Sequence, residues 1–216
     1  YIVNGSLNSA TMTLSSYGAT EGWGGHRATK AWYGLFGSLG TSTDDRAQLF
    51  WTAGHTYEMT DYKEWTNGYP SIKFRNSNFI GGTTPTSFSG TDFPLFRLAD
   101  AYLMYAECVV RGATGGSISQ AVDYVNAVRE RSNASIITAG DLTLNFLIDE
   151  RGRELNLEGH RRSDLIRFGM FTGGSYLWPW KGNALNGTSI PSTYKLFPIP
   201  VQALQANPNL TQNPGY

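Results

Sequence analysis

Sustained helical periodicity begins near Phe96, and this feature most constrains the fold. Apolar residues between Ala99 and Val110 fall at i, i+3, i+4, i+7 and i+11, which places them on one face of an amphipathic helix. Gly112 follows at the position of a C-cap glycine. Ser117 and Gln120 have capping-box spacing before a second apolar series, which predicts another helix after a short turn.

The predicted helices form an antiparallel pair that resembles a tetratricopeptide unit. One such unit cannot bury its apolar faces alone and needs neighbouring helices. Further helices are predicted over residues 143–158 and 163–168. We therefore expect a mainly α fold, with residues 91–216 forming a helical region that ends in an extended tail.

Residues 1–90 follow a different pattern, in which Gly, Ser, Thr and Asn interrupt every short apolar run. Such interruptions break helices and mark turns. Short strands are predicted over 49–52 and 71–75, and a short helix over 29–36. This part holds 15 aromatic residues but only 12 charged ones. We expect a loop-rich, aromatic subdomain whose loops run over the surface.

Composition excludes several classes of function. Lys plus Arg and Asp plus Glu both number 17, so the net charge is zero. This balance argues against a nucleic-acid binder and against a polybasic membrane patch. No stretch approaches the roughly 18 apolar residues of a membrane-spanning helix.

The sequence suggests no metal or cofactor site. Cys108 is the only cysteine, so neither an intrachain disulfide nor a thiol-based zinc site is possible, and we expect it to pack in a helix as a small apolar residue. The three histidines lack metal-binding spacing. Asp44 and Asp45 read as a turn-capping pair rather than calcium ligands, and no phosphate loop or nucleophile elbow is present.

A charged tract between residues 149 and 167 allows two interpretations. Glu150, Glu154 and Glu158 repeat at i+4 and share one helical face, among five nearby arginines. A glycosidase would use carboxylates such as Glu150, Glu154 or Asp164 as acid and base. Guanidinium groups lower carboxyl pKa values and favour ion pairs instead. We predict a structural ion-pair network of Glu150, Arg153, Glu154, Glu158, Arg161, Asp164 and Arg167.

Several segments, in the same order along the chain, resemble the C-terminal portion of the SusD/RagB family, the outer-membrane nutrient-binding lipoproteins of Bacteroidetes. The strongest are FRLADAYLMYAE (96–107), AVDYVNAVRER (121–131), ERGREL with EG (150–155, 158–159), RRSDLIR (161–167), LFPIP (196–200) and NPNLTQNPGY (207–216). GWGG (22–25), Asp45-Arg46 and residues 71–76 are also similar. The resemblance covers most of the chain.

The resemblance implies tetratricopeptide-like helices with a loop-rich subdomain, and a lid-like partnership with a SusC-like TonB-dependent transporter. It implies no enzymatic activity and no cofactor. The family's signal peptide, lipid-bearing cysteine and N-terminal helical repeats are not in this sequence, so we expect a C-terminal fragment. Full-length members are lipid-anchored and exposed on the cell outer membrane.

Family members bind glycans through aromatic side chains on loops. A flat ring covers the apolar face of a pyranose, and Trp or Tyr also donates a hydrogen bond to a hydroxyl. Neutral glycans need no compensating charge, which agrees with the low content of charged residues in residues 1–90. The candidate binding residues are Trp23, Trp32, Trp51, Trp65, Tyr69, Trp178 and Trp180. The alternatives are a glycoside hydrolase and a peptide-binding helical-repeat scaffold.

Overall fold

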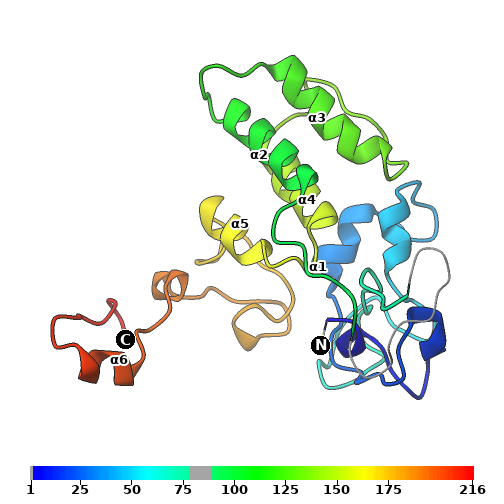
Figure 1. Ribbon diagram of the computed structural model, residues 1–216, viewed down its shortest axis with the longest axis horizontal. Coiled ribbons are helices and arrows are strands. Elements are labelled where there is room, and N and C mark those ends of the chain that lie inside the picture. Colours follow the sequence, from blue (N-terminus) through cyan, green and yellow to red (C-terminus); the bar gives the residue numbers. More distant parts are fainter. Residues whose placement is uncertain (1, 78–88) are drawn as a thin grey trace. The chain divides into compact units, whose positions relative to one another are not determined.

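The two helices of the predicted pair are formed, and the second begins at its predicted cap. In the computed structural model, which describes residues 2–77 and 89–216, α2 spans Leu98–Val110 and α3 spans Ile118–Glu130. Ser117 Oγ accepts a hydrogen bond from Gln120 N at 3.2 Å, so the predicted cap is formed. Figure 1 shows α2 and α3 side by side with α4 against α2. The mainly helical fold class is confirmed.

A shared apolar core joins these three helices. Leu103 and Ala106 of α2, Val125 of α3 and Leu147 of α4 are fully buried in one cluster. The predicted apolar face of α2 therefore supplies the core. Cys108 is exposed, so the prediction of a packed cysteine is wrong. It lies two residues, or about 200° of helical rotation, from Ala106 and so points away from the core.

Helix α4 spans Leu144–Glu154 and ends four residues before the predicted limit. Thr143 caps its first turn, accepting from Phe146 N at 3.1 Å. Leu157 and Gly159 have φ values of 57° and 81°, which no α-helix accommodates. Glu158 is therefore carried by the turn after α4 and not by the helix. The following α5 spans Arg161–Arg167.

The first part of the chain consists of single turns joined by loops. The turns are η1 (Asn4–Ser6), η2 (Leu14–Tyr17), α1 (Lys30–Tyr33), η3 (Gly34–Phe36) and η4 (Asp45–Leu49). The predicted helix over 29–36 is confirmed as α1 followed by η3. The two segments predicted as strands are reduced to one isolated bridge between Phe50 and Ser71, because η4 occupies the chain up to Leu49.

The chain divides into two units, Tyr1–Arg161 and Arg162–Tyr216. The second unit contains η5 (Lys181–Asn183), η6 (Ser192–Lys195) and α6 (Val201–Ala206). The division into subdomains 1–90 and 91–216 stays a prediction. No helix in the described ranges is long and apolar enough to span a bilayer.

Candidate functional site

A cavity of about 800 Å³ lies in the loop-rich part of the first unit, and we call it the tyrosine cavity. Tyr57 and Tyr69 supply its aromatic wall together with Phe50. Uncharged polar side chains, including Gln48 and Thr52, line the rest, and no charged residue is among the described lining residues. The remaining lining residues are Gly37, Ser38, Leu39, Gly40 and Ala47.

Tyr33 of α1 holds the two cavity tyrosines in place. It is fully buried, with its ring centroid 5.0 Å from that of Tyr57 and 4.4 Å from that of Tyr69. Its hydroxyl donates a hydrogen bond to the Tyr57 carbonyl. Tyr69 is also tied by its backbone to Ala28, with N···O distances of 2.8 and 3.2 Å. Tyr33 does not line the cavity itself but packs behind the two tyrosines that do.

The cavity chemistry suits a neutral, hydroxyl-rich ligand. Tyr57 is 45% exposed, so part of its ring is accessible to a ligand. Burial, and to a smaller extent the neighbouring Tyr57, raise the pKa of Tyr69, which keeps its hydroxyl protonated at neutral pH. The rings offer apolar faces, and the amide and hydroxyl groups offer hydrogen bonds.

The predicted tryptophans of the first unit do not join this cavity. Trp51 and Trp65 pack against the apolar cluster around Val3, Leu7 and Tyr17. Trp65 Nε1 donates to Thr11 Oγ1 at 3.2 Å, whereas no described group accepts from the buried Nε1 of Trp51.

Two further tryptophans of this unit differ in exposure. Trp23 is 51% exposed, and its Nε1 donates to Glu21 at 3.3 Å. Trp32 is half-buried, with its ring 5.0 Å from that of Phe50 and its Nε1 bonded to the Gly152 carbonyl at 2.9 Å. Trp32 therefore links the loop-rich part to α4.

Trp178 and Trp180 lie in the second unit and are both half-buried. Trp178 is 5.9 Å from Tyr176 and 6.3 Å from Phe171 between ring centroids, and Lys181 Nζ lies 4.5 Å from its centroid. Of the seven candidates, only Tyr69 lines the tyrosine cavity. Their roles in glycan binding stay predictions. Tyr57 was not among them, because nothing in sequence distinguishes its exposure from that of its neighbours.

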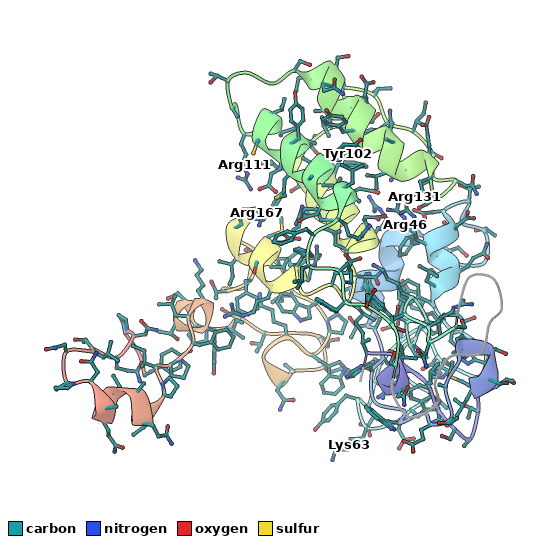
Figure 2. All side chains as sticks on the ribbon, viewed as in Figure 1. Arg46, Lys63, Tyr102, Arg111, Arg131 and Arg167 are labelled. Carbon is teal, nitrogen blue, oxygen red and sulfur yellow. The ribbon has the colours of Figure 1, made fainter. Side chains whose placement is uncertain are left out.

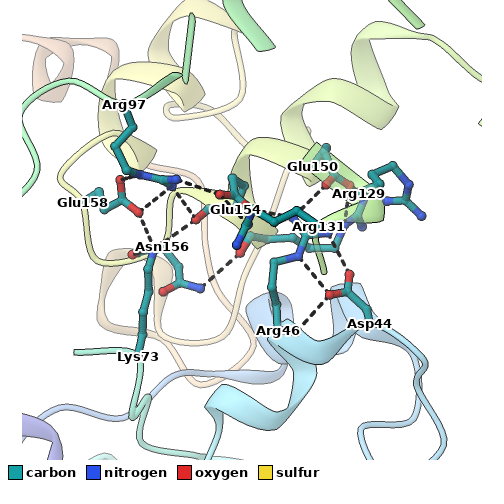
Figure 3. A network of polar contacts seen from close by, with 12 residues as sticks. Asp44, Arg46, Lys73, Arg97, Arg129, Arg131, Glu150, Glu154, Asn156 and Glu158 are labelled. Atoms are coloured by element: carbon teal, nitrogen blue, oxygen red, sulfur yellow. Dashed lines mark hydrogen bonds and ion pairs between the residues drawn. The ribbon is translucent and has the colours of Figure 1, made fainter. Parts of the chain in front are cut away.

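A second feature is a buried cluster of ion pairs, the charged network, shown in Figure 3. Glu150 is fully buried and forms ion pairs with Arg46, Arg129 and Arg153 at N···O distances of 2.6–2.9 Å. Arg46 also pairs with Asp44 at 2.8 Å. The α4 carboxylate Glu150 is thus joined to η4 and to α3.

Glu154 and Glu158 continue the network. Glu154 forms ion pairs with Arg46, Arg97 and Arg131 at N···O distances of 2.7–2.9 Å. Glu158 pairs with Arg97 at 2.7 Å and with Lys73. Lys73 Nζ also donates to the Glu154 carbonyl at 3.0 Å. Residues from five chain segments therefore meet around one turn of helix and the loop after it.

Both carboxylates are held in the ionised state. Burial alone would raise the pKa of Glu154, but the hydrogen bond from Arg97 and the charges of Arg131 and Arg46 outweigh it and lower the pKa. Burial also works to raise the pKa of Glu158, and hydrogen bonds from Arg97 and Lys73 lower it overall. A general acid needs a raised pKa, so this arrangement suits ion pairing better than proton transfer.

The structure redistributes the predicted network. Glu150, Arg153, Glu154 and Glu158 lie together, whereas Asp164 pairs with Arg167 at 2.8 Å in the second unit. Arg161 donates to the Ile148 carbonyl at 2.7 Å. The sequence analysis missed six partners, which come from distant segments: Asp44, Arg46, Lys73, Arg97, Arg129 and Arg131.

No group of three or more His, Cys, Asp or Glu side chains placed to hold a metal ion occurs in the described ranges. In the described part of the first unit, the neutral tyrosine cavity and the charged network are the candidate sites.

The SusD family profile matches residues 40–216. The chain belongs to the SusD family. It is 43% identical over 177 residues to the starch-binding protein SusD of Bacteroides thetaiotaomicron, covering 80% of this chain and 31% of that protein. The chain thus spans about a third of the length of this curated relative.

Solved structures support the same assignment. A SusD superfamily protein from Bacteroides vulgatus aligns with a TM-score of 0.65 at 26% identity, covering 90% of this chain and 41% of that one. A second SusD superfamily protein, from Parabacteroides distasonis, aligns with a TM-score of 0.59 at 29% identity. The alignment covers 88% of this chain and 42% of the Parabacteroides chain. The predicted family resemblance is therefore confirmed.

Proposed function

We propose that this SusD family chain is part of a non-catalytic protein that binds oligosaccharides or polysaccharides at the cell surface. The observation that carries the proposal is the tyrosine cavity, an uncharged space of about 800 Å³ with Tyr57 and Tyr69 in its wall. Its volume falls within the range of about 300–1,000 Å³ typical of small-molecule sites. The name of the curated relative, a starch-binding protein, supports the same class of ligand.

The ligand we propose is a neutral glycan. A charged sugar would lose water on entering a cavity without a compensating charge, and that loss is unfavourable. Tyr57 would stack on a pyranose face, while Tyr69, Gln48 and Thr52 would contact hydroxyls. The other predicted residues, Trp23 above all because of its exposure, remain candidates for additional contacts along a longer chain.

Isothermal titration with maltoheptaose and with xylan and mannan oligosaccharides tests the proposal. We expect heat of binding with at least one neutral oligosaccharide, and a loss of about tenfold in affinity, or about 1.4 kcal/mol, for Tyr57→Ala. Tyr62→Ala is the matched control, because Tyr62 is 50% exposed in the same region but does not line the cavity. Unchanged affinity in Tyr57→Ala would refute a role for the cavity.

We also propose that the protein has no hydrolytic activity. The lowered pKa values of Glu154 and Glu158 support this, because neither group holds a proton to donate at neutral pH. Incubation with the same glycans should release no reducing sugar at any pH. Release that is abolished by Glu154→Gln would favour the glycoside hydrolase alternative. Absence of binding to every glycan would instead favour the peptide-binding scaffold.

The proposed partner is a SusC-like TonB-dependent transporter in the outer membrane, to which the bound glycan is delivered. Membership of the SusD family supports this partnership, and it also supports a surface location through a lipid anchor. Co-purification of the full-length protein with the transporter from detergent-solubilised outer membranes tests the partnership. Recovery of the full-length protein without the transporter under those conditions would contradict it.

A further inference from the structure

The loop that carries Trp23 is fixed to the core of the first unit by a short antiparallel pairing. Gly24 N donates to the Leu7 carbonyl at 2.7 Å, and Ser9 N donates to the Gly22 carbonyl at 3.4 Å. Leu7 is itself buried in an apolar cluster. A side chain on such a backbone needs little further ordering when a ligand binds.

The same pairing brings Asn8 beside Trp23. The two residues lie directly opposite each other in an antiparallel bridge, so their side chains point to the same face with Cβ atoms about 4.5–5.5 Å apart. Asn8 Oδ1 accepts from Ala10 N at 2.8 Å, which identifies the other terminal atom as the Nδ2 donor. No described residue accepts a hydrogen bond from this Nδ2, and the atom is not sealed from solvent.

Glu21 adds a carboxylate at the edge of the Trp23 ring. Trp23 Nε1 donates to Glu21 Oε2 at 3.3 Å. Because the indole N–H lies in the ring plane, the carboxylate stands at the ring edge and covers neither face. Glu21 is exposed, and no described residue donates to its Oε1. Trp23 itself is 51% exposed, so a ligand can reach the ring and both polar groups from solvent.

We propose that Asn8, Glu21 and Trp23 form a surface site for one ring of a neutral sugar. The indole covers the apolar face of a pyranose. A sugar hydroxyl both donates and accepts, so the hydroxyls around that ring can donate to Glu21 and accept from Asn8 Nδ2. An apolar side chain of a peptide would leave both polar groups unused, and the charge of Glu21 would repel an acidic sugar.

This inference rests on the proposed glycan binding and gives it a second location. None of the three residues lines the tyrosine cavity. Glu21 and Asn8 are new to the site, because neither is aromatic and neither carries a recognisable motif. Only the bridge and the indole hydrogen bond bring them to Trp23.

Titration of the ¹⁵N-labelled full chain, followed by NMR, tests the inference at the residue itself, because each tryptophan Nε1–H gives its own signal. The titrants are maltoheptaose and the xylan and mannan oligosaccharides. We expect the Trp23 signal, assigned with Trp23→Phe, to shift saturably with at least one of them. The signal of Trp51, whose Nε1 is buried, should stay in place.

Two conservative variants each remove one polar contact. Asn8→Asp keeps the acceptor for Ala10 N and loses the donor, whereas Glu21→Gln keeps the size of the side chain and loses its charge. Each should weaken the binding reported by the Trp23 signal about tenfold. Glu130→Gln is the control, because Glu130 is an exposed carboxylate of α3. Figure 2 shows Arg131, the next residue, well away from the N-terminal segment in dark blue.

The outcomes separate this site from the tyrosine cavity. A Trp23 signal that stays fixed while calorimetry records glycan binding would overturn the inference alone. Affinity in Asn8→Asp or Glu21→Gln equal to that in Glu130→Gln would also overturn it. A saturable Trp23 shift together with unchanged affinity in Tyr57→Ala would refute the cavity and leave this site standing. If no glycan gives heat or moves the Trp23 signal, the proposed function fails and the inference fails with it.

Discussion

Replacement of Glu154 by Gln tests how far the charged network stabilises the fold. Glu154 is 3% exposed and accepts hydrogen bonds from Arg46, Arg97 and Arg131. Glutamine has nearly the same volume, so the change removes the charge without opening a cavity. It also points an amide N–H₂ at guanidinium donors, so one side of the new residue has no acceptor to contact.

The magnitude follows from the burial of the partners. Removing one member of a buried ion pair costs about 3–5 kcal/mol, because the other charge is left without compensation. Arg46 is 5% exposed but keeps Asp44 and Glu150, and Arg97 keeps Glu158, so the lower end of that range applies. We therefore expect a loss of about 3 kcal/mol in the free energy of unfolding. For a chain of this size, this corresponds to a decrease of about 6–12 °C in Tm.

Urea unfolding followed by tryptophan fluorescence measures this loss. Glu58→Gln is the matched control, since Glu58 pairs with Lys30 at 2.8 Å while both side chains are about half exposed. Exposed pairs contribute at most about 1 kcal/mol. If Glu154→Gln and Glu58→Gln reduce stability equally, the network does not stabilise the first unit and the reasoning is refuted.

Two further predictions concern pH and backbone conformation. The pKa values of Glu154 and Glu158 are lowered from about 4.5, so their contribution to stability should be complete above pH 4.5 and be lost as the pH falls through the folded-state pKa values. Glu158→Gln should therefore flatten the acid side of a curve of unfolding free energy against pH. An unchanged curve would contradict this prediction. Gly68→Ala should cost about 2 kcal/mol or more and displace the adjacent Tyr69, because φ is +72° and a Cβ would lie 2.4 Å from the Ala28 carbonyl oxygen. Gly54→Ala, at φ +73° with nothing within 4 Å, should lose only about 1 kcal/mol of unfolding free energy by thermal denaturation; equal losses would show that the contact with Ala28 is unimportant.

The helices and their N-caps could be predicted from sequence because the interactions that form them are local. Apolar spacing over residues 99–110 and the Ser117 cap act within one or two turns, and the structure keeps both of them. The family resemblance rests on the same segments and is confirmed. The end of α4 could not be predicted from sequence, because Leu157 adopts a left-handed backbone conformation that its residue type does not indicate.

Contacts between distant segments decided the rest. The carboxylates of the network were visible in sequence as an i+4 series, but their partners Arg46, Lys73 and Arg97 lie 50 or more positions away, and only chain folding brings them within hydrogen-bond distance. The same holds for the tyrosine cavity, whose wall depends on Tyr33 packing against both Tyr57 and Tyr69. Local sequence specifies backbone hydrogen bonding and periodicity. Exposure and charge pairing depend on the whole chain, so only the tertiary structure determined which aromatic residues line a cavity and which bury their rings.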